Sequence, residues 1–240
     1  PATTLADGCY SGMFSGCTSL TTVPSNYLPA TTLADGCYSG MFSGCTNLTT
    51  TPTLSATTLA KSCYSGMFSG CTSLTTVPEL PVTTLAHSCY RNMFYGCTSL
   101  TTVPSNYLPA TTLEQACYSG MFGRCTNLTT APDLPATTFN NGYEVYKGMF
   151  EYCTSLTTAP VLPSTTAPTW YGYNNMFNGC TSLNHVEVMC TNVNSSNAAN
   201  ITYNWLNNVA ASGTIICAIN PDTNEPYLPL NSASGIPNGW

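Results

Sequence analysis

Cysteine is the residue type in this sequence with the widest capacity for chemistry. The chain has 14 cysteines in 240 residues, and a thiol can form a disulfide, bind a metal or act as a nucleophile. Such heavy use is unusual in a reducing cytosol and predicts an extracellular or cell-surface location. Cys153, Cys180, Cys190 and Cys217 stand apart, and the other ten form five Cys-x7-Cys pairs: Cys9/Cys17, Cys37/Cys45, Cys63/Cys71, Cys89/Cys97 and Cys117/Cys125.

Two arrangements of these cysteines remain open from the sequence. In the first, disulfides join the two members of a pair, or neighbouring copies such as Cys17 and Cys37, with Cys190 and Cys217 as a separate possible pair. Eight residues of straight helix span about 12 Å, whereas a disulfide needs Cα atoms within about 7 Å, so a bond within a pair requires the chain to turn back near Gly16. In the second arrangement, the cysteines form two ladders of small buried thiols.

Neither a metal site nor a catalytic site follows from the sequence. Zinc is disfavoured because there is no Cys-x2-Cys and there are only 2 histidines. His87 lies near Cys89, but Cys89 occupies a repeated position, which indicates a structural role. His185 and Glu187 alternate on a predicted strand as a conceivable acid/base pair, although two polar residues on a surface strand explain them better. Calcium-loop, phosphate-loop and nucleophile-elbow motifs are absent, so we expect no enzyme, no metal and no cofactor.

The composition excludes two further classes of partner. Lys and Arg number 4 against 10 Asp and Glu, which gives a net charge of −6. Nucleic acids and anionic membrane surfaces both attract clustered basic residues, which this chain lacks. No apolar run reaches the length of a transmembrane helix. The chain is therefore expected to fold without binding nucleic acid or inserting into a membrane.

A sequence repeat positions most of the cysteines. Met-Phe occurs seven times, 26 to 28 residues apart, beginning at Met13, Met41, Met67, Met93, Met121, Met149 and Met176. A cysteine follows each of these methionines after four residues, and a leucine after seven. In the first copy, Leu5, Cys9 and Met13 have the spacing of a helix stripe, and residues 20–23 read as a short strand that Pro24 ends. One such unit cannot bury its own apolar residues, so the units are expected to stack.

These elements predict an α/β repeat solenoid. We expect a curved leucine-rich-repeat stack, with short parallel strands on the concave face and short helices on the convex face. The array of about seven repeats is predicted over residues 1–183. Residues 184–240 are predicted to form a degenerate repeat and a C-terminal cap, including a helix over 200–209 and a strand over 213–218.

The repeated frame also resembles a known family. It reads Met-Phe-x-Gly-Cys-Thr-Ser-Leu-Thr-Thr-Val-Pro, then Leu-Pro-Ala-Thr-Thr-Leu-Ala and Cys-Tyr-x-x-Met-Phe. This pattern resembles the BspA-like, or Treponema-pallidum-type, leucine-rich repeats found in surface proteins of gut Bacteroidetes, over roughly residues 1–190. That family has Ala-Phe where this chain has Met-Phe. The resemblance implies the repeat architecture and a non-catalytic surface protein for adhesion or recognition, with a host or bacterial surface protein or glycan as partner.

The repeat presents a candidate binding surface on its predicted concave face. Parallel strands lie about 4.8 Å apart, so residues at one repeat position form a regular row that suits an extended glycan or peptide. Tyr27 and Tyr107, in two-residue insertions, are further candidate contacts. Two other interpretations are a threonine ladder that only stabilises the strands and an ice-binding array, which would need a flat face rather than a curved one. The row consists of Thr22, Thr50, Thr76, Thr102, Thr130 and Thr158.

A structural role is the second class of function that the sequence supports. The array begins at Pro1 within a repeat, and charged residues make up only 6% of the chain. Both features suit end-to-end self-association into a fibre or into a bacterial or phage appendage. A monomer that binds mucin or glycans would favour recognition, whereas filaments would favour the structural role.

Overall fold

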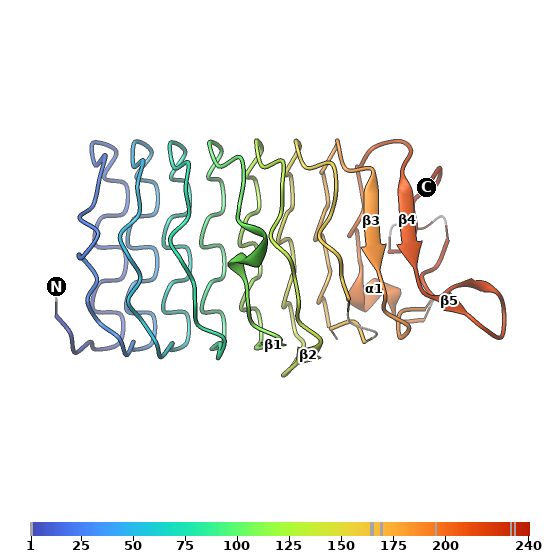
Figure 1. Ribbon diagram of the computed structural model, residues 1–240, viewed down its shortest axis with the longest axis horizontal. Helices are drawn as coiled ribbons and strands as arrows, with labels where there is room; N and C mark the ends of the chain where they lie inside the picture. Colours follow the sequence, from blue (N-terminus) through green and yellow to red (C-terminus); the bar gives the residue numbers. More distant parts are fainter. Residues whose placement is uncertain (1, 164–165, 169, 195, 231, 233) are drawn as a thin grey trace.

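Each repeat forms one flat coil, and the coils stack side by side along a single axis. Figure 1 shows them in register along a nearly straight line, with the two ends of the chain at opposite ends of the stack. The repeat solenoid is therefore present, but the expected curvature is not. Pro1 lies outside the described residues. The computed structural model describes residues 2–163, 166–168, 170–194, 196–230, 232 and 234–240.

One long side of each coil, here called the turn wall, is a chain of β-turns. In the first coil it spans residues 6–17, where alternate N–H groups donate to the carbonyl three residues back, as Cys9 N does to Ala6 O (3.2 Å). The N–H groups between them donate to the next coil, as Tyr10 N does to Cys37 O (2.9 Å). An α-helix would keep all of these bonds within its own segment. The short helices predicted for the repeats are therefore wrong.

The backbone conformation at every fourth residue explains the difference. Leu5, Cys9 and Met13 have a spacing of four residues that a helix and this chain of turns share. The residues that distinguish the two are Gly8 and Gly12, both with φ of +62°. Glycine adopts positive φ readily, whereas other residues pay about 1–2 kcal/mol for it. Glycine also disfavours a helix by about 1 kcal/mol per residue, so the sequence selects the turns.

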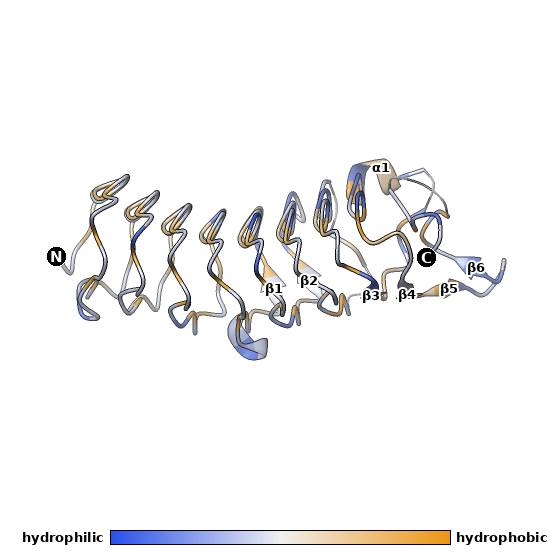
Figure 2. Ribbon diagram, turned by 90° about the horizontal axis from the view of Figure 1, so that it is seen from above, coloured by the Kyte–Doolittle hydropathy of each residue, from blue (hydrophilic) through white to orange (hydrophobic). Residues whose placement is uncertain are grey.

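The opposite side of each coil, the front wall, is extended and pairs in parallel with its neighbours. Isolated bridges join Thr102 to Thr130 and Thr158 to His185. Where a two-residue insertion lengthens the coil, the 3-10 helix η1 (Ser105–Tyr107) bulges outward (Figure 2). The regular strands form two parallel pairs, β1 (Thr112–Leu113) with β2 (Thr138–Phe139) and β3 (His185–Val188) with β4 (Thr214–Cys217). β4 confirms the strand predicted over 213–218.

The C-terminal segment continues the stack and then folds back over it. The helix α1 (Ala198–Ile201) has only four residues, and Asn204 and Asn208 then take φ of 54° and 55° as in the turn wall. The helix predicted over 200–209 is therefore wrong. Beyond β4, a hairpin forms, and the indole Nε1 of Trp205 donates to the carbonyl of Gly235 (2.8 Å). The hairpin pairs β5 (Ile219–Asn220) with β6 (Glu225–Pro226) in antiparallel fashion.

The core between the two walls consists of columns of identical side chains. The tyrosine rings stack with centroids 5.8 to 6.2 Å apart, and the phenylalanine rings with centroids 5.5 to 5.8 Å apart. Each ring stacks on its equivalents in the adjacent coils, so stability depends on nearest-neighbour contacts. The columns are Tyr10, Tyr38, Tyr64, Tyr90, Tyr118, Tyr146 and Tyr173, and Phe14, Phe42, Phe68, Phe94, Phe122, Phe150 and Phe177.

The core columns generate a stability prediction. Leu74 is 0% exposed, and Leu74→Ala should lower the free energy of unfolding by about 2–5 kcal/mol because it leaves a cavity. The matched variant Thr76→Ala, two residues away on the exposed surface, should change it by less than about 0.5 kcal/mol. Urea denaturation followed by circular dichroism measures both. A large loss for Thr76→Ala would show that the exposed threonines are structural.

Candidate functional site

The six predicted threonines form an exposed row on the front wall, here called the threonine face: Thr22, Thr50, Thr76, Thr102, Thr130 and Thr158. Among the described residues, none of their hydroxyls bonds to another protein group. The preceding threonines differ, since Thr49 Oγ1 donates to Thr21 O (3.1 Å) and Thr129 Oγ1 donates to Thr101 O (3.0 Å). In these coils the first residue of the Thr-Thr dipeptide therefore donates its hydroxyl to the backbone of the neighbouring coil, while the hydroxyl of the second residue is exposed to solvent.

The two tyrosines proposed as ligand contacts lie against the core. Tyr107 is 6% exposed, and its ring centroid lies 6.4 Å from that of Phe94 and 6.3 Å from that of Phe122. Tyr27 is partly buried against Phe14, with the centroids 6.0 Å apart. Their insertions direct these rings inward, where they fill space between coils. Tyr107 is a core residue, which corrects its interpretation as a surface contact.

All fourteen cysteines, each within the described part of the chain, are free thiols. The second cysteine of each coil from the second to the seventh donates its S–H to a phenylalanine carbonyl of the coil before, as Cys71 Sγ does to Phe42 O (3.2 Å). The first cysteines form another column, which is buried from Cys37 onward. Of the two arrangements that the sequence left open, the structure has the thiol ladders. The other five donors are Cys45, Cys97, Cys125, Cys153 and Cys180, at 3.0 to 3.2 Å.

Burial makes these thiols poor nucleophiles. It raises the pKa of Cys71 to about 12 and that of Cys125 to about 12, because a thiolate is costly in an apolar interior. The thiolate is the reactive form of cysteine. At neutral pH these columns are therefore protonated packing groups.

The described residues also show how potential metal ligands and the His185/Glu187 pair lie. No group of three or more His, Cys, Asp or Glu side chains there is placed to hold a metal ion. His185 and Glu187 lie on β3, half-buried, and form no ion pair with each other in that part of the chain. No described helix has the length and apolar character needed to cross a bilayer.

One column of surface residues contains larger side chains than the small polar residues typical of the repeat, and it was not identified from the sequence as a candidate site. Gln115, Tyr143 and Trp170 occupy equivalent positions in consecutive coils, because each carbonyl accepts an N–H bond of 2.9 to 3.0 Å from the turn wall of the coil before. With Asn141 they line a shallow hollow of about 510 Å³, here called the aromatic hollow. The sequence signal was the change of residue type along one repeat position, which runs Asp7, Asp35, Lys61, His87, Gln115, Tyr143 and Trp170.

The sequence matches one family. The model for the BspA type leucine rich repeat region matches in 6 copies, over residues 9–128, 37–183 and 116–216. The chain belongs to the BspA-type leucine-rich-repeat family. This explains the 26 to 28-residue period and the parallel, coil-by-coil pairing.

Two solved structures resemble this BspA-type chain. A leucine rich cell surface protein from Faecalibacterium prausnitzii A2-165 is 16% identical, with 88% of this chain and 76% of that chain covered and a TM-score of 0.27. A leucine-rich repeat protein from Bacteroides ovatus ATCC 8483 is 15% identical, with 92% and 80% covered and a TM-score of 0.23. No curated protein matches the chain.

The thiol ladders generate a labelling prediction. In the native BspA-type chain, an alkylating reagent at pH 8 should modify the exposed Cys9 and Cys17 first and the half-buried Cys217 more slowly. The eleven buried cysteines should react only after denaturation, because burial excludes the reagent and raises their pKa. Mass spectrometry of the labelled, unreduced chain counts the modified thiols. Detection of disulfide-linked peptides would contradict the ladder arrangement.

The same burial predicts a loss of stability at alkaline pH. Below pH 9, the reference pKa of a thiol, both folded and unfolded chains keep these protons. Between pH 9 and 12 only the unfolded chain ionises, so folding becomes less favourable as pH rises, by up to about 1.4 kcal/mol per pH unit for each thiol. Cys117→Val should make the free energy of unfolding fall less steeply with pH, because it removes the contribution of one thiol whose pKa is raised to about 12. The sixth coil already has Val145 at that position, and urea denaturation from pH 8 to 11 gives both slopes.

Proposed function

We propose that this protein is a non-catalytic extracellular or cell-surface protein that binds a protein or glycan through its threonine face, in adhesion or ligand recognition. The supporting observation is the row of six exposed hydroxyls that have no partner within the described protein. The location follows from the surface proteins that the repeats resemble. Buried, protonated thiols also tolerate an oxidising environment, because an oxidant cannot reach them.

The chemistry of the threonine face suits an extended, polar and uncharged ligand. Each hydroxyl can donate one hydrogen bond and accept two, and each lies one coil from the next. A single exposed hydroxyl contributes little to affinity, so binding would require contacts with the threonines of several consecutive coils. The low content of charge, 6% of residues, limits electrostatic steering, and binding should therefore depend only weakly on salt.

The test compares two triple variants that carry the same substitution. Replacing Thr76, Thr102 and Thr130 by Ala should weaken binding to immobilised mucin or to a protein array by at least about tenfold, because three adjacent rungs lose their hydroxyls. The control replaces three other exposed threonines outside the threonine face: Thr32, Thr58 and Thr112. Surface plasmon resonance measures both variants. Equal affinities would contradict a role for the threonine face.

The second candidate function, end-to-end stacking into a fibre or appendage, is favoured by the last regular strand. β4 pairs only with β3 among the described strands, so its outer edge has no strand partner, and Leu230, Ile236 and Trp240 of the C-terminal segment line a hollow beside it. Ile216 and Ile219 are 45% and 49% exposed beside that edge, and an open apolar edge is a template for further pairing. Filaments in electron micrographs would favour this role, whereas a monomer in light scattering at high concentration would exclude it.

A further inference from the structure

The aromatic hollow is a concave site with both apolar and polar walls. Trp170 is 57% exposed and Tyr143 is 38% exposed, which is unusual for large rings on a surface built mostly from Ser, Thr and Gly. Gln115 and Asn141 complete the lining, and each amide offers one acceptor and two N–H donors. Flat rings beside a few polar groups are the usual composition of a small-molecule site.

The hollow is held rigidly by the turn wall beneath it. Glu144 N donates to Trp170 O and Ala116 N donates to Tyr143 O, both at 3.0 Å. The ring of Tyr143 meets that of Tyr171 edge to face, with centroids 5.9 Å apart. Backbone ladders and a braced ring reduce the entropy that a ligand must remove on binding.

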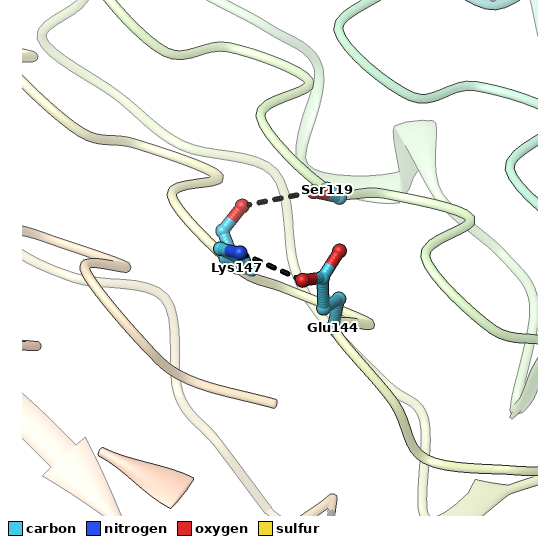
Figure 3. A network of polar contacts seen from close by, with 3 residues as sticks. All are labelled: Ser119, Glu144 and Lys147. Atoms are coloured by element: carbon cyan, nitrogen blue, oxygen red, sulfur yellow. Dashed lines mark hydrogen bonds and ion pairs between the residues drawn. The ribbon is translucent and has the colours of Figure 1, made fainter. Parts of the chain in front are cut away.

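The charged side chains next to the hollow already have polar partners. Figure 3 shows Lys147 Nζ bound to Glu144 Oε1 at 2.7 Å, while Ser119 Oγ donates to the Lys147 carbonyl at 3.4 Å. Glu114, beside Gln115, accepts a hydrogen bond from Asn140 Nδ2 (2.8 Å). No charged residue lines the hollow itself. The net charge of −6 further disfavours an anionic ligand, so the chemistry fits a neutral one.

Two lining residues also have an uncommon backbone conformation. Trp170 and Asn141 have φ of 41° and 48°, a region that costs residues other than glycine about 1–2 kcal/mol. Asparagine tolerates it, but a tryptophan with more than half of its surface exposed gains little packing in return. Positive φ at residues other than glycine also occurs elsewhere on the turn wall, as at Arg124 and Tyr152, so the argument for a site depends on the lining side chains.

We propose that the aromatic hollow binds one ring of a neutral saccharide. The partly positive C–H face of the sugar stacks on the negative faces of Trp170 and Tyr143, and its hydroxyls exchange hydrogen bonds with Gln115 and Asn141. The site lies on the turn wall, whereas the threonine face lies on the opposite, front wall. It is therefore independent of the function proposed for that face.

The experiment titrates the intact chain with neutral oligosaccharides and with their sialylated counterparts, both chosen from a glycan array. We expect a dissociation constant of about 1 mM for the best neutral ligand, as befits a shallow one-ring site, and at least tenfold weaker binding of the sialylated form. Tryptophan fluorescence reports binding, because Trp170 is exposed and Trp205 is fully buried, and the Trp170→Ala variant separates its signal from that of the half-buried Trp240.

The variants separate this site from others. Trp170→Ala and Tyr143→Ala should each weaken saccharide binding by at least about tenfold, whereas Tyr203→Ala, which removes a ring 50% exposed in the last coil, should leave it unchanged. The triple threonine variant should also bind the saccharide normally. No binding of neutral saccharides at about 10 mM, or unchanged binding by Trp170→Ala, would overturn the proposal. Loss in the triple threonine variant alone would assign saccharide binding to the threonine face.

Discussion

The alternation of hydrogen bonds in the turn wall is the constraint on which the rest of this structure depends. Every second N–H closes a turn within its own coil, and the N–H groups between them bond to the next coil. This pattern fixes the register of each coil on its neighbour, so equivalent residues fall into columns. The columns in turn require side chains that stack on copies of themselves. Phenylalanine and tyrosine meet this requirement with nearly parallel rings, 3° apart between Phe150 and Phe177.

The thiol columns follow from the same register. The second cysteine of a coil is small enough for its column and donates S–H to a phenylalanine carbonyl that already accepts an N–H, as Phe14 O does from Cys17 N. Cys153 and Cys180 are therefore fully satisfied without a partner cysteine. The first column packs by size alone, so Val145 takes the place of a cysteine there without leaving a group unbonded.

Outward positions are less constrained than the columns, and variation collects in them. At the position of Gly96, the next two coils have Arg124 and Tyr152, each with φ of 58°. The Arg124 guanidinium lies 5.0 Å from the ring centroid of Tyr152 and 5.9 Å from that of Tyr95. These cation–π contacts, worth about 0.5–1 kcal/mol each at exposed sites, offset the cost of positive φ. The aromatic hollow lies on the same wall. Along this chain the interior positions of the repeat mostly keep the same residue type from coil to coil, while the surface positions vary.

The sequence by itself determined the repeat length, the stacking of coils and the burial of the repeated Leu, Cys and Met positions, because a unit of this size cannot bury its apolar side chains alone. The stacked tyrosine and phenylalanine columns were not predicted. The sequence also identified the threonine row, since residues at one repeat position must align. A four-residue spacing could not by itself separate a helix from a chain of turns; positive φ at residues such as Gly12 decided that. Only the tertiary structure turned Tyr107 inward and gathered Gln115, Tyr143 and Trp170, which lie 28 and 27 residues apart, into one hollow. Their alignment follows from the shared repeat position, but the hollow that they line with Asn141 depends on where the side chains point, which the repeat pattern does not encode.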